Sequence, residues 1–311
     1  LRGAGRPRDP KKRQSCRHED GRARPTPDCR PAAVIRHLMS PFRVLRNYLT
    51  TDRRSSTRAR MVSKGSAATV YPVDFLNGAP SNGFNVDEYK TDKIVLRRIN
   101  PGSYVAGSPD KPVKEYGRTD EREVQHRVML TKPFYIGIFE VTQQQYENVM
   151  GKGANNSAYK GPYRPVEKVS YNTIRGQADT ATHQYDWPWT GEVADASFMG
   201  RLRSKCKSKD ASGEYKVAVD GFDLPTEFQW EYACRAGTFT TYYWGNGASD
   251  GYEYEWTYEN PGTKGKKHPV GKLKPNPWDL YDMLGNKMEF VLDNRPTGAV
   301  SDGSPALDPL G

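Results

Sequence analysis

Two short helices, each opened by the same capping sequence, are the clearest regular elements in this chain of 311 residues. Residues 142–145 (Thr-Gln-Gln-Gln) and 226–229 (Thr-Glu-Phe-Gln) each have a hydroxyl that can accept from the amide three residues on, and a glutamine that can reach back. Apolar residues follow each box at helical spacing, and Gly151 and Gly237 supply the stops. The sequence therefore predicts two short helices, each with one apolar face to bury.

Strand-forming runs are equally short. Residues 93–99, 126–130 and 133–139 are rich in β-branched and aromatic residues and predict strands. A further helix is expected at 195–205, with Phe198 and Leu202 on one face. Long loops dense in Gly, Asn, Tyr and Trp make up the rest, and such loops need something that fixes them, such as a bound metal or an aromatic core. The predicted fold class is α+β with little regular secondary structure.

Several aromatic residues in these loops allow two interpretations. They could line a groove that binds a sugar or a peptide, or they could pin the loops into the core. The second interpretation is favoured because aromatic side chains bury well. The residues concerned are Trp187, Trp189, Tyr242, Tyr243 and Trp244.

The formal net charge of +10 is confined to one end of the chain. Residues 1–60 hold 17 of the 47 Lys and Arg residues but 5 of the 37 Asp and Glu residues, so the remaining residues carry 30 basic and 32 acidic side chains. A basic-tailed nucleic-acid-associated protein is therefore a hypothesis for the tail, and no nucleic-acid partner is expected for the folded domain. The predicted organisation is a basic, disordered tail at 1–60, a linker or lead-in strand at 61–93, and a folded domain at 94–311.

The sequence contains no membrane span, because no run approaches the ~20 apolar residues that a crossing helix needs. Residues 1–60 also lack the apolar stretch of a signal peptide. The chain begins at Leu1, so a signal peptide upstream of that residue would place the protein in the cell envelope or outside the cell. Localisation stays unknown from the sequence.

The four cysteines have neither a CxxC pattern nor the spacing of metal ligands. Cys234 falls four residues after Trp230 on the second predicted helix, which favours a buried core thiol. A disulfide between Cys206 and Cys234 stays open. His126 and His268 stand isolated in the sequence, and we expect structural roles for both.

Five segments, in this order, resemble the sulfatase-modifying-factor family, that is, the formylglycine-generating-enzyme-like proteins. Together they cover about two hundred residues, and their order is more specific than any one of them. The segments are INPGSYVAGS at 99–108, EREVQHRV and PFYIGIFEVTQ within 121–143, RPVEKVSY at 164–171, FDLPTEFQWEYACRAG at 222–237, and HPVG through PNPWDLYDMLGN at 268–286.

This resemblance implies a C-type-lectin-like fold. The best-known members of the family oxidise a sulfatase cysteine to formylglycine with O₂ and a copper ion held by two cysteines, while related members bind ligands without that chemistry. The implied function is that of a formylglycine-generating-enzyme-like protein, with a sulfatase, another protein or peptide, or a glycan as partner. The alternative is a non-catalytic C-type-lectin-like binding module.

The family's calcium site carries over onto four positions of this chain. The carboxylates of Asp282 and Glu289 and the main-chain carbonyls of Gly285 and Lys287 would form an all-oxygen set suited to Ca²⁺. The alternative is a turn with solvated carboxylates. A second calcium site, at the asparagine matching Asn260, is not expected because the loop that follows is basic.

The family's redox cysteines and terminal strands match no part of this sequence and would follow residue 311. The domain is therefore expected to be incomplete at its C-terminus. The copper ligands are absent from these 311 residues, no catalytic residue is assigned, and this chain is expected to form no formylglycine.

Overall fold

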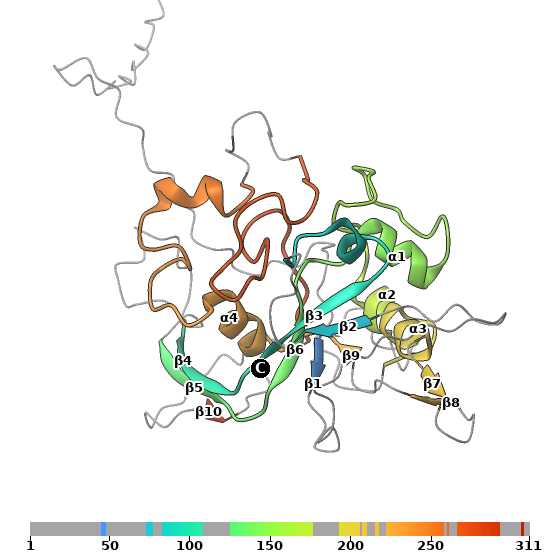
Figure 1. The fold of residues 1–311 in the computed structure, drawn as a ribbon, viewed down its shortest axis with the longest axis horizontal. Coiled ribbons are helices and arrows are strands. Elements are labelled where there is room, and N and C mark those ends of the chain that lie inside the picture. The colour runs from blue at the N-terminus through green and yellow to red at the C-terminus, as the bar shows by residue number, and fades with distance from the viewer. Residues whose placement is uncertain are drawn as a thin grey trace, which may run out of the picture.

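The computed structural model shows a five-stranded sheet, a three-stranded sheet and a two-stranded ribbon, together with short helices (Figure 1). It describes residues 45–47, 73–76, 83–107, 125–176, 193–205, 207–209, 215–217, 222–257, 260, 266–292 and 306–307. No helix within these ranges is long and apolar enough to cross a membrane.

The larger sheet has five strands in the order β2-β3-β6-β1-β9. β2 runs parallel to β3, and the other neighbours are antiparallel. All four residues of β6 are buried, as expected for a central strand covered on both faces. The strands are β1 (Leu45–Asn47), β2 (Val73–Leu76), β3 (Ile94–Ile99), β6 (Phe134–Gly137) and β9 (Phe222–Asp223).

The smaller sheet has three strands in the order β10-β5-β4, and a separate ribbon pairs β7 with β8. Strands β4 and β5 are antiparallel, whereas β10 is parallel to β5. The strands are β4 (Gly102–Ala106), β5 (His126–Leu130), β7 (Lys207–Lys209), β8 (Tyr215–Val217) and β10 (Ala306–Leu307). The predicted strands at 93–99, 126–130 and 133–139 are thus confirmed as β3, β5 and β6.

Both predicted capping boxes are formed. Thr142 and Thr226 accept from the amides of Gln145 and Gln229, and each glutamine bonds back to the threonine amide. Two short 3₁₀ helices accompany the α-helices. The helices are η1 (Asp87–Lys90), α1 (Gln143–Met150), α2 (Tyr171–Arg175), α3 (Phe198–Lys205), α4 (Glu227–Arg235) and η3 (Ala248–Glu253).

Two elements differ from the sequence prediction. α3 begins at Phe198, whereas the prediction began at residue 195, because Asp195 lies in the turn before the helix. Strand β1 lies within the segment predicted to be disordered, where three residues pair with β6 and β9. A strand this short leaves no periodic pattern to detect. The rest of residues 1–60 lies outside the described part of the chain.

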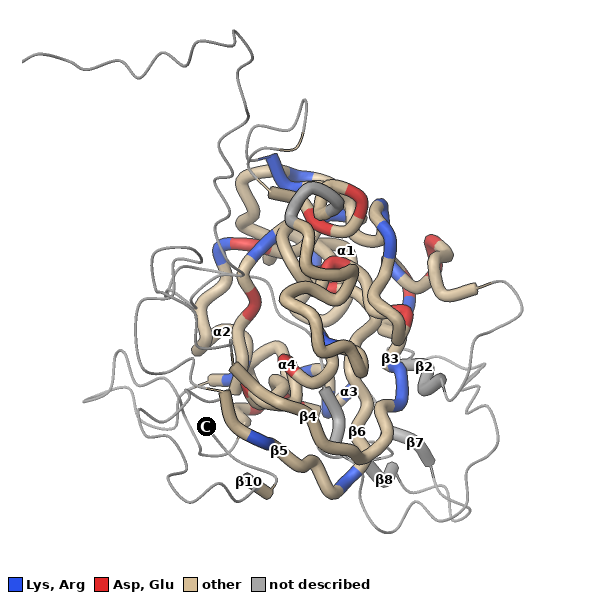
Figure 2. The backbone as a smooth tube through the Cα atoms, turned by 90° about the vertical axis from the view of Figure 1, so that its left-hand side faces the viewer, with Lys and Arg blue, Asp and Glu red and all other residues tan. Residues whose placement is uncertain are grey.

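The apolar residues form two clusters, one on each side of the molecule. The first joins the β4–β5 pair to α4 and to the chain around Leu280, and the second packs α1, α2 and α3 against the larger sheet. Figures 1 and 2 show α4 near β4 and the later loops, apart from α1. Mixed helix and strand with little regular secondary structure is therefore the observed architecture, as predicted.

Candidate functional site

The loop that carries the four predicted calcium ligands is anchored to α4 by a buried asparagine. The side-chain amide of Asn276 donates to the carbonyls of Ala233 and Cys234, at 2.7 and 3.1 Å. Its oxygen accepts from the amides of Trp278 and Leu280. One side chain therefore both satisfies carbonyls at the C-terminal end of α4 and closes the turn that begins the loop.

Asp282 is 2 % exposed and turns inward. Its Oδ2 accepts a hydrogen bond of 2.7 Å from the amide of Gly271. The residue has a φ of 53°, in the left-handed region that aspartate and asparagine tolerate better than most side chains. The aspartate thus has a conformational role in addition to any role as a ligand.

A buried lysine accompanies Asp282. Lys90, at the end of η1, is 5 % exposed, and its ammonium lies 5.5 Å from the centre of the Phe139 ring. Burial lowers the pKa of Lys90, while the carboxylates of Asp87 and Asp282 act to raise it. The carboxylate of Asp282 therefore interacts electrostatically with the buried ammonium of Lys90, which η1 supplies.

The middle of the loop is held against the chain at Trp256. The amide of Asn286 donates to the Trp256 carbonyl at 2.9 Å, and the Asn286 side chain donates to Glu140 Oε2 at 2.9 Å. Asn286 also exchanges hydrogen bonds with the main chain of His268. Because Gly285 has a φ of 79° and its added Cβ would lie 2.6 Å from the Trp256 amide nitrogen, no other residue fits there without a shift.

The last two predicted ligands send their side chains to different partners. Glu289 Oε2 accepts from the Trp230 ring nitrogen of α4 at 3.0 Å. The Lys287 ammonium lies 3.0 Å from Glu167 Oε2, so it pairs with a carboxylate from another loop. Burial acts to raise the pKa of Glu167, but hydrogen bonds from Lys287 and from the amides of Tyr159 and Ala158 hold it below its ordinary value.

Asp282 and Glu289 therefore lie buried in one loop, but they face different neighbours. The described ranges hold no group of three or more His, Cys, Asp or Glu side chains placed to bind a metal. A cation at this loop would therefore need the main-chain carbonyls of Gly285 and Lys287 in addition to the carboxylates of Asp282 and Glu289, which together are the predicted donor set.

A match to a protein-family model decides which family this chain belongs to. The model, described as a sulfatase-modifying factor enzyme 1-like domain, matches residues 85–300, more than half of the chain. This chain belongs to the sulfatase-modifying-factor, or formylglycine-generating-enzyme-like, family.

Proteins similar to this chain have names that describe different functions. "Chaperone protein LppX" of Paenibacillus barcinonensis is 28% identical over 193 residues, which cover 56% of this chain and 66% of that protein. The formylglycine-generating enzyme of Bos taurus is 23% identical over 237 residues, covering 63% of this chain and 56% of that enzyme. This chain therefore spans less than two thirds of either protein. Among solved structures, PvdO from Pseudomonas aeruginosa matches with a TM-score of 0.48 and 23% identity, over 68% of this chain and 77% of that one.

Cys234 is the cysteine of this family domain that the structure places. It is 8 % exposed, lies in the core cluster beside Ala233, and has its Sγ 3.9 Å from the carbonyl oxygen of Met283. The prediction of a buried core thiol is confirmed. Cys206 lies outside the described residues, as does Asp293, which follows the predicted calcium motif.

The aromatic loop residues that the structure describes pin the loops together. Trp244 stacks with Tyr242 and with Tyr254, with ring centroids 4.6 and 5.3 Å away, and Tyr242 and Tyr243 are buried. The burial of these rings confirms the interpretation of an aromatic core for this part of the loops. Trp187 and Trp189 lie outside the described ranges.

Sequence reasoning missed a stacked pair beside the loop. The rings of Trp256 and His268 lie 3.8 Å apart with planes 15° from parallel. Burial lowers the pKa of His268, and Arg164, Lys267 and Lys266 lower it further by repulsion. His126, by contrast, packs its ring against the edge of Phe228. Nothing in the local sequence connects Trp256 with His268, because the contact depends on the fold.

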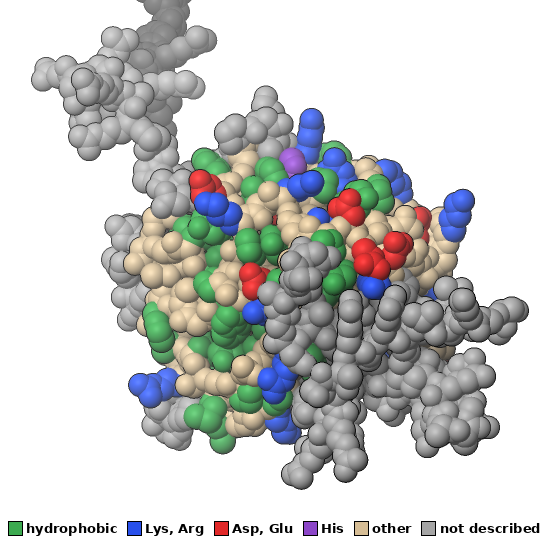
Figure 3. Space-filling model, in the orientation of Figure 1, with side chains coloured by type: hydrophobic (Ala, Val, Ile, Leu, Met, Phe, Trp, Pro, Cys, Tyr) green, Lys and Arg blue, Asp and Glu red, His purple; other side chains and the backbone are tan. Residues whose placement is uncertain are grey.

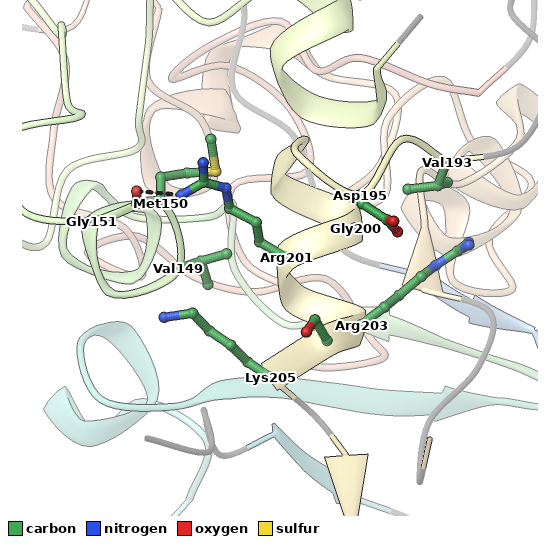
Figure 4. A pocket seen from close by; sticks show the side chains of 10 residues that line it. Val149, Met150, Gly151, Val193, Asp195, Gly200, Arg201, Arg203 and Lys205 are labelled. Carbon is green, nitrogen blue, oxygen red and sulfur yellow. Dashed lines mark hydrogen bonds between the residues drawn. The ribbon is translucent and has the colours of Figure 1, made fainter. Parts of the chain in front are cut away.

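A separate cavity of about 680 Å³ lies between the end of α1 and α3 (Figure 4). Its basic side chains already have partners in the fold. Arg201 donates to the Met150 carbonyl at 3.0 Å, and Lys205 donates to the Asn148 carbonyl at 2.9 Å. These cations satisfy the C-terminal carbonyls of α1 and oppose its dipole, so we assign them a structural role.

Proposed function

We propose that this domain binds a polypeptide partner and that the 311 residues do not carry out formylglycine chemistry by themselves. The observation that carries the non-catalytic part of this proposal is the position of Cys234. A copper ion held by two thiolates requires two cysteines that are close together and accessible to O₂ and substrate. Cys234 is instead packed in the core among Ala233 and Met283.

The other cysteines offer no pair with the family's spacing. Cys16 and Cys29 precede the matched domain, and Cys206 stands 28 residues before Cys234 in the sequence. Cys206 and Cys234 also fall outside the positions at which the family carries its redox cysteines. Thiolate chemistry is therefore assigned to none of these cysteines.

The relatives support a polypeptide as the bound molecule. One similar protein is named a chaperone and another a formylglycine-generating enzyme, and the substrate of the latter chemistry is a cysteine of a sulfatase chain. Both names describe proteins that act on other proteins. A sulfatase, or another client polypeptide, is accordingly favoured over a glycan as the partner of this chain.

We also propose that Ca²⁺ stabilises the loop at 282–289. Asp282 and Glu289 would supply carboxylate oxygens, and Gly285 and Lys287 would supply main-chain carbonyls. The support is the burial of both carboxylates, at 2 % and 8 % exposure, within one tightly turned loop. The role of the ion would be to hold the loop against α4 and Trp256, with no part in chemistry.

Two assays on the purified chain test this function. The first supplies copper(I), O₂, a thiol reductant that provides the two further electrons needed to reduce O₂, and a peptide that contains the sulfatase cysteine motif, and mass spectrometry then follows replacement of the thiol by an aldehyde. We expect no conversion, either for the parent or for Cys234→Ala. Conversion by the parent would overturn the non-catalytic assignment.

The second assay follows aggregation of a chemically unfolded, reduced sulfatase by light scattering. We expect the chain to slow aggregation at stoichiometric concentration, with the same effect from Cys234→Ala. Scattering that matches a serum-albumin control at equal mass would contradict polypeptide binding.

A further inference from the structure

One continuous segment of the domain carries cations and no acids. Between Asn260 and Trp278 there is no Asp or Glu, while the segment contains five lysines and His268. Residues 61–311 carry slightly more acidic than basic side chains, so this concentration is a local feature of the domain. The lysines are Lys264, Lys266, Lys267, Lys272 and Lys274.

The fold brings another cation to this segment. The amide of Val270 donates to the Tyr163 carbonyl at 2.8 Å, which fixes the segment beside the loop that contains Arg164. Arg164, Lys266 and Lys267 are together defined here as the basic surface. Lys266 is exposed, and the other two are partly exposed. Figure 3 shows Lys and Arg side chains along the upper part of the face drawn, together with a histidine and with some Asp and Glu side chains among them.

The charges of the basic surface are not neutralised by exposed acids. None of its three side chains forms a salt bridge with another described residue, in contrast to Lys287 and Lys274. The acids that face Lys267 are Glu167 and Glu140, and both are buried and bonded, to Lys287 and Asn286 respectively. Burial and, to a smaller extent, the Lys287 ammonium lower the pKa of Lys267, while Glu167 and Glu140 act to raise it.

The stacked pair of Trp256 and His268 adds ring nitrogens that can form hydrogen bonds beside the basic surface. Trp256 Nε1 and His268 Nε2 are buried and have no hydrogen-bond partner among the described residues. A buried polar group left unsatisfied is unfavourable, so an acceptor that bound beside the Trp256 ring and reached its Nε1 would recover part of the lost hydrogen-bond energy. Arg164 contributes a planar guanidinium, which suits carboxylates.

We propose that the basic surface docks an acidic segment of the polypeptide partner, an inference that rests on the proposed function and names the chemistry of the client. Aspartate and glutamate carboxylates fit three clustered cations beside an indole donor. A nucleic acid is disfavoured as the partner because its binding depends on many contacts between cations and successive phosphates. Apart from the basic surface, this domain is close to neutral.

Fluorescence anisotropy with a labelled oligo-glutamate peptide tests the proposal on the full chain. The test variant is Lys266→Glu/Lys267→Glu. The matched control is Lys132→Glu/Lys152→Glu, which makes the same charge change at two exposed lysines elsewhere. Since every protein keeps the basic residues 1–60, the difference between the two double variants isolates the basic surface. Thermal unfolding checks that both variants are folded.

We expect affinity for oligo-glutamate to fall by about tenfold or more in the test variant and by less than about twofold in the control, with both effects weaker at high salt. Trp256→Phe, which keeps the stack but removes the donor, should give a smaller loss. Equal losses in the two double variants would assign binding to the tail and overturn the proposal. A loss of oligothymidylate binding in the test variant, relative to the control, that equals or exceeds the loss of oligo-glutamate binding would also overturn it.

The two assays separate this inference from the proposed function. If the parent slows sulfatase aggregation but does not bind oligo-glutamate, the basic surface is wrong as the docking site while polypeptide binding stands. If oligo-glutamate binds at the basic surface but aggregation is unaffected, the proposed function fails instead.

Discussion

The Lys287 ammonium lies 3.0 Å from the Glu167 carboxylate, and this ion pair joins the loop between α1 and α2 to the loop with the predicted calcium ligands. The side chain of Glu167 is 6 % exposed and also accepts from the amides of Ala158 and Tyr159. The carbonyl of Lys287 is a predicted ligand, while its ammonium serves a different contact. A basic residue at this position is therefore compatible with the motif.

Replacing Lys287 by Met should destabilise the domain by about 2 kcal/mol, because a buried carboxylate loses its cation while part of the original pair was solvated. The pKa of Glu167 is lowered in the folded state, so its contribution is present above the unfolded value and lost as pH falls through the folded value. The variant should consequently lose less stability than the parent on acidification. Urea unfolding at neutral and acidic pH measures both effects, with Lys152→Met as control; equal curves for parent and Lys287→Met would contradict the prediction.

Calcium should raise the melting temperature of the parent, since a ligand that binds only the folded state stabilises it by mass action. Glu289→Gln should remove most of this shift: the amide oxygen can still accept from Trp230, but the charge is gone. Asp279→Asn is the control, because it likewise replaces a nearby carboxylate by its amide, but at a side chain that pairs with Arg97. Absence of a calcium shift in the parent would sink the site.

Local sequence signals predicted the elements whose stabilising contacts are themselves local. The capping boxes at Thr142 and Thr226 are complete within four residues, so their pattern was sufficient. Helix α2 was missed because its five residues span little more than one turn, although Ser170 caps it. Strand β1 was missed because it is held by β6 and β9, which lie far along the chain.

In the candidate site, too, the local features could be predicted from the sequence and the long-range contacts could not. The presence of Asp282 and Glu289 on one loop follows from the motif. Their actual partners, Gly271 and Trp230, do not, because these contacts depend on tertiary packing. The bond between Asn286 and Glu140 joins residues 146 positions apart, a separation over which a single sequence carries no pairing signal.

Glu255 should give the domain a pH dependence near neutrality. Burial beside Gly251 and the Trp244 ring raises its pKa from 4.5 to about 7. With a raised folded pKa, the group's stabilising contribution is present below the unfolded value and is lost as pH rises through the folded one. The stability of Glu255→Gln relative to the parent should therefore increase by roughly 2–3 kcal/mol between pH ~4 and pH ~8.

Thermal or urea unfolding across that range measures the difference between the two proteins, which cancels the titration of all other groups. Glu253→Gln is the control, since its exposed carboxylate bonds to Lys274 at the surface. If the two variants show the same pH profile relative to the parent, Glu255 is not the group responsible.

Replacing Gly285 and Gly151 by alanine should distinguish the cost of backbone strain from the cost of a steric clash. Both have positive φ angles, of 79° and 110°, so alanine at either position is strained by about 1–2 kcal/mol. An added Cβ at Gly151 meets nothing within 4 Å, whereas at Gly285 it lies 2.6 Å from both the amide nitrogen and the carbonyl oxygen of Trp256. These are main-chain atoms held by the bond from Asn286, so they can move only if the bridge to Trp256 breaks.

We therefore expect Gly285→Ala to destabilise the domain by at least ~3 kcal/mol, from strain plus disruption of this contact, and Gly151→Ala by ~1–2 kcal/mol. Denaturant unfolding of the two variants decides the matter, and equal losses would show that the loop at 282–289 is not clamped to Trp256.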